Sequence, residues 1–267
     1  MKLRCGIWLT LLAVVCFYAK TLSEVQRDLL YWPSHSYVSP QKAELPQFAE
    51  NVLTMSDGTE VMTWYAVGDK QKPALLFFHG NAFQIAKYAP HLLPFVEKGY
   101  GVLMMEYRNF GNTKGVTLQE DIFADAAATF DWLTAQGYPQ IVVYGYSYGT
   151  AVAAGLTTRR PVQKLILTAP FASMRGLVAE KPVPLGSWVM RDTYPSAEYL
   201  RQYHNPLLVV HGANDSLIPV HHGQMMYEAA ASSDKELAVL PQTDHRNIFF
   251  KEKNLPTIFE WLEKHGI

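Results

Sequence analysis

The sequence predicts an α/β domain built on a doubly wound, mostly parallel sheet. Two observations carry this prediction: short, wholly apolar runs recur along the chain, and helical patterns separate them. Runs without period-two alternation are typical of strands that are buried on both faces. Strands that alternate with helices join through right-handed crossovers, which place helices on both sides of the sheet. The six runs are 75–78, 102–105, 141–144, 165–167, 207–210 and 237–240.

The domain is expected to span 48–267 and to open with a β-hairpin. Apolar stretches at 48–55 and 60–67 flank Asp57-Gly58, a dipeptide typical of tight turns. A long helix follows the second apolar run. Its expected start is Thr117, which has the spacing of a capping box with Glu120.

Residues 1–22 are predicted to be a signal peptide or a signal anchor. Lys2 and Arg4 precede a largely apolar stretch, and both interpretations place the domain on the non-cytoplasmic side of a membrane. A buried N-terminal helix is the alternative. Residues 23–47 are expected to connect this stretch to the domain, and the aromatic residues Tyr31 and Trp32 would lie at a membrane interface or, more simply, pack on the domain.

Composition narrows the function classes. The chain has 267 residues, 49% of them hydrophobic, and a net charge of −1 without a cluster of basic residues, so no nucleic-acid partner is expected. The two cysteines, Cys5 and Cys16, both precede the domain, which excludes a disulfide framework or a cysteine-ligated metal within it. No zinc-binding spacing or glycine-rich phosphate loop occurs, so neither a metal nor a cofactor is expected.

The pentapeptide Gly145–Gly149 (GYSYG) stands between an apolar run and an alanine-rich helical pattern. This arrangement is typical of a nucleophile elbow, in which a sharp turn lifts a serine hydroxyl above the sheet. Glycines flank the serine because a side chain there would collide with the neighbouring strand or helix. Ser147 is therefore the candidate nucleophile.

A serine hydroxyl needs a histidine to remove its proton, and a buried carboxylate normally orients that histidine. Asp215 and His245 each come just after one of the apolar runs. The order Ser147, Asp215, His245 is the one expected for a nucleophile on such an elbow. Asp244 is the rival carboxylate, but it adjoins the histidine in sequence, so we expect its side chain to point elsewhere.

Two backbone N–H groups are predicted to bind the oxyanion of a reacting carbonyl. One belongs to Tyr148, directly after the nucleophile, and the other to Asn81, in a glycine-containing turn after the first parallel strand. His79 lies in the same turn, where we interpret it as a structural residue that orients the loop. We also interpret His211, His221 and His222 as structural or surface residues.

Five motifs stand together along the chain: Phe78–Asn81 (FHGN), Glu106–Gly111 (EYRNFG), Gly145–Gly149 (GYSYG), Gly212–Pro219 (GANDSLIP) and Asp244-His245. They resemble the α/β-hydrolase superfamily, and most closely its serine aminopeptidase-like and Bem46-like branch, which includes membrane-associated hydrolases. The resemblance extends from about Leu29 to the C-terminus. It implies a sheet of about eight strands opened by the hairpin. It also implies the triad Ser147, Asp215 and His245 and the amide donors Asn81 and Tyr148.

The chain departs from that branch near the expected pocket. Glu106 stands where the branch usually has Asp, Asn109 where Gly is frequent, and Asp244 where Gly usually precedes the histidine. Arg108, in the same motif, is interpreted as an ion-pair partner or loop anchor and not as a substrate ligand.

Residues 171–204, rich in proline and apolar residues, interrupt the rhythm of strands and helices. We expect a short insertion over the active-site edge whose apolar side chains line an acyl-binding pocket. An ordinary helix pair that completes the core is the alternative. The candidate pocket residues are Phe83, Tyr146, Phe171 and Trp188.

Together these features predict a serine hydrolase that cleaves carboxylic esters or thioesters through an acyl-enzyme on Ser147. A serine peptidase or aminopeptidase-like amide hydrolase is the enzymatic alternative, and a non-catalytic scaffold with the same fold is the alternative from another class. The expected partners are a small or lipid-like acyl substrate and a membrane, reached through the N-terminal segment. The sequence makes no prediction of oligomeric state.

Overall fold

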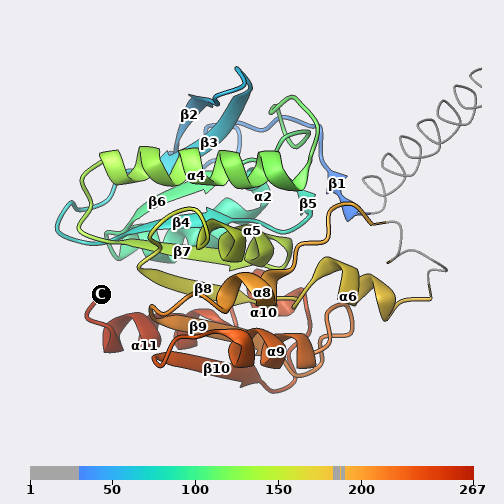
Figure 1. Cartoon of the computed structure of the whole chain (residues 1–267). Coiled ribbons are helices and arrows are strands. Elements are labelled where there is room, and N and C mark those ends of the chain that lie inside the picture. The colour runs from blue at the N-terminus through green and yellow to red at the C-terminus, as the bar shows by residue number, and fades with distance from the viewer. Residues whose placement is uncertain (1–29, 183–186, 188–189) are drawn as a thin grey trace, which may run out of the picture.

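An eight-stranded sheet forms the centre of the molecule, with the strand order β10-β9-β8-β7-β4-β6-β3-β2 (Figure 1). The computed structural model describes residues 30–182, 187 and 190–267. Neighbouring strands from β10 to β6 run parallel, whereas β3 and β2 are antiparallel to the strands beside them. The prediction of a mostly parallel sheet of about eight strands is confirmed.

The strands are β1 (Trp32–Pro33), β2 (Ala49–Thr54), β3 (Glu60–Ala66), β4 (Ala74–Phe78), β5 (Ala82–Phe83), β6 (Gly101–Met105), β7 (Ile141–Tyr146), β8 (Lys164–Thr168), β9 (Leu207–Gly212) and β10 (Lys235–Leu240). The helices are α2 (Ile85–Tyr88), the short 3-10 helix η1 (Ala89–Leu92), α3 (Leu93–Glu97), α4 (Gln119–Ala135), α5 (Tyr148–Leu156), α6 (Met174–Ala179), α8 (Ser196–Leu200), α9 (His221–Ala229), α10 (Asn247–Phe250) and α11 (Leu255–Lys264).

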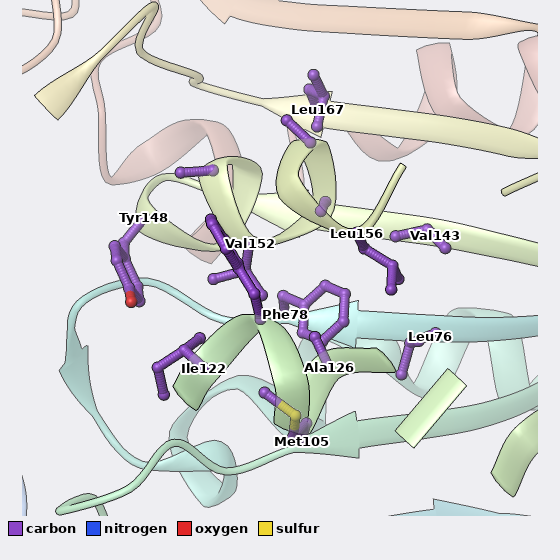
Figure 2. Close-up of a cluster of buried hydrophobic side chains, with 14 of the residues drawn as sticks. Leu76, Phe78, Met105, Ile122, Ala126, Val143, Tyr148, Val152, Leu156 and Leu167 are labelled. Atoms are coloured by element: carbon purple, nitrogen blue, oxygen red, sulfur yellow. The ribbon is translucent and has the colours of Figure 1, made fainter. Parts of the chain in front are cut away.

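The apolar runs form strands that are covered on both faces, so alternate residues of one strand belong to two different cores. In β4, Leu76 and Phe78 pack with α4 and α5, whereas Leu75 and Phe77 pack with α3 and α11. Figure 2 shows part of the first core, in which Val152 of α5 lies close to Phe78. Burial on both faces explains why these runs lack polar residues.

The last run is an exception. β10 was expected among the strands buried on both faces, but it lies at the edge of the sheet, all its residues are partly exposed or exposed, and the side chain of Val239 is 41% exposed. An apolar run alone does not distinguish an edge strand from a central one, because the number of neighbours depends on topology.

The capping-box prediction for α4 is wrong. The helix begins at Gln119 after Leu118, whose side chain makes no capping hydrogen bond. The Thr117 hydroxyl instead donates to the backbone carbonyl of Arg108 at 2.6 Å. Thr117 therefore fixes the loop after β6, and the helix N-terminus is supported by the negative charges of Glu120 and Asp121 in its first turn.

The end of the connecting segment packs on the domain. Leu30 and Tyr31 are buried, and β1 pairs in parallel with β5, with Trp32 opposite Ala82. In the described part of the chain no helix is both long and apolar enough to cross a membrane. The predicted signal or anchor, 1–22, lies outside the described residues.

The insertion contributes to the core over α5. Leu177 of α6, Tyr194 and Leu200 of α8 are buried in the same cluster as the side chains of α5. The described part of 171–204 thus packs as a layer of the domain, between the parallel strands β8 and β9.

A buried ion pair joins the loop after β6 to α4. Arg108 Nε and Nη2 each donate to one carboxylate oxygen of Asp125 at 2.8 Å, and Nη1 donates to Asp57 in the hairpin turn at 2.6 Å. The side chain of Asp125 is only 1% exposed. Arg108 is therefore an ion-pair partner and loop anchor, as interpreted from the sequence.

Replacing Arg108 with leucine is expected to lower the free energy of unfolding by about 3–5 kcal/mol, because Asp125 would remain buried without its counter-charge. Urea and thermal unfolding followed by circular dichroism measure the change. The matched control is Arg160→Leu, which removes a two-point pair with the solvent-facing Asp131 and should cost at most about 1 kcal/mol. Similar losses in the two variants would contradict the assignment of Arg108 as a buried anchor.

Candidate active site

Ser147 occupies the sharp turn between β7 and α5. Its backbone has φ 53° and ψ −119°, a conformation that a non-glycine residue rarely adopts. Its N–H donates to the carbonyl of Thr168 at 2.9 Å, and its own carbonyl accepts from Thr150 N at 2.9 Å. The hydroxyl makes no capping bond to the helix, so it remains available for another partner.

The flanking glycines are required by packing. A Cβ at Gly149 would lie 2.0 Å from the carbonyl oxygen of Phe78, and a Cβ at Gly145 would lie 2.4 Å from the carbonyl oxygen of Gly149. Neither contact is possible for real atoms. The elbow thus brings the N-terminus of α5 directly against the end of β4.

His245 lies within hydrogen-bond reach of both Ser147 and Asp215. Ser147 Oγ is 2.9 Å from His245 Nε2, and His245 Nδ1 is 2.7 Å from Asp215 Oδ2. A carboxylate only accepts hydrogen bonds, so the neutral ring carries its proton on Nδ1 and turns the Nε2 lone pair toward the serine. The structure therefore brings together the three residues that the sequence assigned to one site.

Asp215 is held by its own loop. Its Oδ1 accepts from the N–H groups of Leu217 at 3.0 Å and Ile218 at 2.8 Å. Burial by itself would raise the pKa of Asp215, but the side chains of His211 and His245, together with the Ile218 amide, hold it well below its usual range. The carboxylate is therefore ionised and suited to stabilise a protonated His245.

The loops that carry Asp215 and His245 are bonded to each other. Asn214 N donates to the carbonyl of Thr243 at 2.9 Å, and Ala213 N donates to the carbonyl of Leu240 at 2.9 Å. A Cβ at Gly212 would lie 2.4 Å from the Thr243 oxygen, so glycine allows this approach. The parallel pairing of β9 and β10 sets the two loops side by side.

Tyr146 supports the histidine. Its hydroxyl donates to the backbone carbonyl of His245 at 2.9 Å, and its ring stacks on Phe249 with centroids 4.6 Å apart. The side chain is 3% exposed, and burial raises the pKa of its hydroxyl, which keeps it protonated as a donor. The sequence indicates Tyr146 only as a pocket residue, because a contact across 99 positions leaves no local pattern.

Asp244 points away from the histidine ring. Its Oδ1 accepts from the N–H groups of Arg246 at 2.9 Å and Asn247 at 2.8 Å, and its Oδ2 accepts from Asn247 Nδ2 at 2.7 Å. The side chain thus closes the turn that begins α10. Asp244 therefore has a local structural role, at a position where the family usually has glycine.

The two predicted oxyanion donors lie at the junction of β4 and α5. Tyr148 is the first residue of α5, and the close contact of Gly149 with Phe78 sets that helix end beside the turn that contains Asn81. Neither backbone N–H has an acceptor among the described residues. Both amides are therefore free to donate to a bound group.

A buried pair shapes the Asn81 turn. His79 Nε2 is 2.9 Å from Glu106 Oε1, and the other carboxylate oxygen accepts from Ile85 N at 3.0 Å. Tyr107 donates to the carbonyl of His79 at 2.8 Å. His79 is fully buried, so it orients this loop and does not face the serine.

The other two departures in this region have local causes. Asn109 has a φ of 69°, in the left-handed region where asparagine is the residue that most readily replaces glycine. Gly111 also has a positive φ, of 54°, and a Cβ there would lie 2.7 Å from the Glu106 carboxylate. The longer side chain of Glu106 is thus accommodated by this glycine.

The pocket candidates are dispersed. Phe83 is 40% exposed beside the Asn81 turn, Tyr146 lies behind His245, and Phe171 is buried in the core with the α5 side chains. Trp188 lies outside the described residues. The candidates Phe83, Tyr146 and Phe171 are not in the lining of the groove that opens at His245.

That groove has a volume of about 580 Å³ and is formed by the loops after β9 and β10. Leu217 and Phe250 give it apolar walls, and Arg246 and Lys251 bring positive charge. The groove reaches His245, but its lining does not include Ser147.

One cluster in the described part of the chain has three groups that commonly bind metals: Glu180, His221 and His222. The backbone N–H of Ala172 points at His222 Nδ1 at 3.3 Å, which leaves the ring proton on Nε2, the atom nearest Glu180. Burial lowers the pKa of His222 and favours this neutral form. A protonated nitrogen is not a metal ligand, so the cluster fits a contact between the end of α6 and α9, in which Glu180 bonds to His221 at 3.0 Å.

The sequence matches the family model described as serine aminopeptidase, S33, over residues 69–203. The match includes the elbow serine and spans half of the chain. The chain belongs to this family. With its α/β-hydrolase relatives and fold, it is a member of the α/β-hydrolase superfamily, as the sequence motifs predicted.

Relatives extend the likeness over most of the chain. An uncharacterized protein of Mycobacterium tuberculosis, Rv2307c, is 32% identical over 229 residues, which cover 83% of this chain and 81% of the relative. WAV2 of Arabidopsis thaliana, an α/β hydrolase domain-containing protein, is 28% identical over 273 residues, which cover 90% of this chain and 88% of the relative.

Solved structures share the fold. The esterase Pf2001 of Pyrococcus furiosus superposes with a TM-score of 0.69 at 22% identity, covering 87% of this chain and 98% of the esterase. A 2-hydroxy-6-oxo-6-phenylhexa-2,4-dienoate hydrolase of Rhodococcus superposes with a TM-score of 0.61 at 16% identity, covering 81% and 99%. Family and fold together identify the chain as an α/β hydrolase.

Asp215→Asn is expected to lower kcat on an activated ester by about 10⁴-fold, because an amide at this position favours the wrong tautomer of the histidine. Asp244→Asn should change kcat only a few-fold, since asparagine also caps a helix and Asp244 does not touch the ring. Steady-state kinetics on both variants, with thermal unfolding as a check of the fold, measure the difference. Equal losses would refute the assignment of Asp215 as the carboxylate that orients His245.

Proposed function

We propose that this α/β hydrolase is a serine hydrolase that cleaves carboxylic esters or thioesters through an acyl-enzyme on Ser147. The observation that carries the proposal is the continuous hydrogen-bond chain from Ser147 through His245 to Asp215, with distances of 2.9 and 2.7 Å. The strained backbone of Ser147 and its position at a helix N-terminus support the same role.

In the proposed reaction, Ser147 Oγ attacks the substrate carbonyl while His245 Nε2 takes its proton. The N–H groups of Asn81 and Tyr148 bind the oxygen that becomes negative, and one such donor is typically worth about 3–4 kcal/mol in the transition state. Asp215 stabilises the imidazolium that forms. His245 then protonates the leaving group, and a water activated by His245 releases the acid.

An amide hydrolase of the aminopeptidase type is the second candidate, and the family description favours it. An aminopeptidase must also bind the free amino group of its substrate, a role suited to a carboxylate beside the site. Asp244 is the single carboxylate in the lining of the groove at His245, and backbone and side-chain N–H groups already occupy its oxygens. The positive charge of Arg246 and Lys251 further disfavours an ammonium group, which supports ester or thioester cleavage.

The apolar walls at Leu217 and Phe250 support an acyl substrate with lipid-like character. A catalytic domain held close to a membrane would have access to such lipid-like substrates. We therefore also propose that residues 1–22 are a signal peptide or anchor that places the domain on the non-cytoplasmic side.

A fluorophosphonate probe is expected to label the folded protein, and Ser147→Ala should abolish the labelling and lower ester turnover by about 10⁶-fold, because the nucleophile is lost. Gel fluorescence and initial rates give the two readouts. Ser56→Ala, which removes an exposed serine hydroxyl in the hairpin turn and leaves the elbow untouched, is the labelling control. Labelling of wild type and Ser147→Ala to the same extent, or of neither, would favour a non-catalytic scaffold.

A panel of p-nitrophenyl esters, acyl thioesters and aminoacyl amides separates the substrate classes. We expect the highest kcat/KM values on esters or thioesters, because the groove offers no free carboxylate for an amino terminus. Faster cleavage of aminoacyl amides would replace the esterase proposal with the peptidase one.

Membrane fractionation tests the N-terminal proposal. If residues 1–22 form an anchor, the full-length protein should stay with the membranes after carbonate extraction, because the apolar stretch remains embedded. The control is a variant that begins at residue 24 and therefore lacks the apolar stretch, and it should be released from the membranes. Recovery of the full-length chain, unshortened, in the soluble fraction would contradict both the anchor and the cleaved signal peptide.

A further inference from the structure

Four residues before the hairpin, Leu30–Pro33, reach both of the proposed oxyanion donors; we name them the lead-in segment. Trp32 N donates to the carbonyl of Asn81 at 2.9 Å, and Asn81 Nδ2 donates to the carbonyl of Leu30 at 2.8 Å. Trp32 and Pro33 also form β1, which pairs with β5 directly after Asn81 (Figure 1). The backbone and the side chain of Asn81 are thus both bonded to the lead-in segment.

The same segment reaches the residue after the nucleophile. The ring of Tyr31 packs edge-on against the ring of Tyr148, with centroids 5.4 Å apart. The hydroxyl of Tyr194, from the insertion, lies 2.8 Å from the hydroxyl of Tyr31 and 2.7 Å from that of Tyr148. All three side chains are at most 4% exposed, so these hydroxyls have no bulk water to replace a lost partner.

These contacts lie next to strained backbone at Ser147 and Tyr194. Ser147 and Tyr194 have positive φ angles, of 53° and 39°, which persist only when the surroundings fix them. Tyr194 N donates to the side chain of Gln119 at 2.8 Å. The cluster of Tyr31, Tyr148 and Tyr194 therefore connects the lead-in segment with the elbow and, through Gln119, with α4.

We propose that the lead-in segment is a positioning element of the oxyanion hole, in which the Trp32 backbone and the Tyr31 side chain hold the amides of Asn81 and Tyr148 where the transition state needs them. This inference rests on the proposed function. Oxyanion donors act through geometry, since they must meet an oxygen that moves as the carbonyl becomes tetrahedral. A small displacement therefore lowers kcat more than it changes substrate binding.

Trp32→Pro tests the backbone contact, because proline lacks the N–H that bonds to Asn81. We expect kcat on an activated ester to fall by about 10- to 100-fold, with KM changed less than about threefold. Binding of an alkyl trifluoromethyl ketone, which forms an oxyanion on Ser147, should weaken by the same factor as kcat/KM. Trp32→Ala is the matched comparison: it deletes a ring that is 59% exposed but keeps the N–H, so kcat should stay within about threefold of wild type.

Tyr31→Phe tests the hydroxyl cluster. We expect a kcat lowered by about tenfold, because Tyr194 loses one of its two buried partners. Tyr37→Phe is the control six residues further on, where the hydroxyl bonds to the exposed Glu50, and it should leave kcat and inhibitor binding unchanged. Thermal unfolding of each variant identifies any that fail to fold, and this second pair carries the test if Trp32→Pro is one of them.

Two results would overturn the inference while the proposed function stands. The first is equal kcat and ketone affinity in Trp32→Pro and Trp32→Ala. The second is a Tyr31→Phe variant that loses stability but retains the kcat and ketone affinity of Tyr37→Phe. A wild-type protein without Ser147-dependent labelling or turnover would instead reject the proposed function itself.

Discussion

The close approach of α5 to the end of β4 is the contact on which the site depends. Gly149 passes so near the carbonyl oxygen of Phe78 that a Cβ would lie 2.0 Å from it. This contact sets the first amide of the helix beside the Asn81 turn and raises Ser147 to the edge where the loops after β9 and β10 emerge. The strained φ of Ser147 is the conformational cost, and the packed layers on both sides of the sheet offset it.

Local patterns and topology rules were sufficient to predict the sheet and the grouping of Ser147, Asp215 and His245. Apolar runs indicate buried strands, and residues that follow parallel strands meet at one edge of the sheet. The edge position of β10 and the first residue of α4 were not predictable in this way. β10 lies at the edge of the sheet although its apolar run resembles those of the central strands, and Thr117 bonds to Arg108 in a loop whose path depends on the ion pair with Asp125.

Long-range side-chain contacts were the main gap. Tyr146 donates to His245 and Tyr31 lies against Tyr148, across separations that leave no periodic signal. The departures at Glu106 and Asp244 were visible in the sequence, but their consequence was not. Each proved to accept hydrogen bonds from backbone N–H groups, so both shape loops around the site.

The strand order also divides the site between regions of unequal local stability. Ser147 follows β7, which has strands on both sides, whereas His245 follows β10, which pairs with β9 at the edge of the described sheet. Edge elements open at a lower free energy than central ones, as separate cooperative units. Local unfolding of the β10 edge would therefore separate His245 from Ser147 while the elbow keeps its fold. If Ser147 and His245 act together as proposed, heat would then inactivate the protein before the central strands unfold.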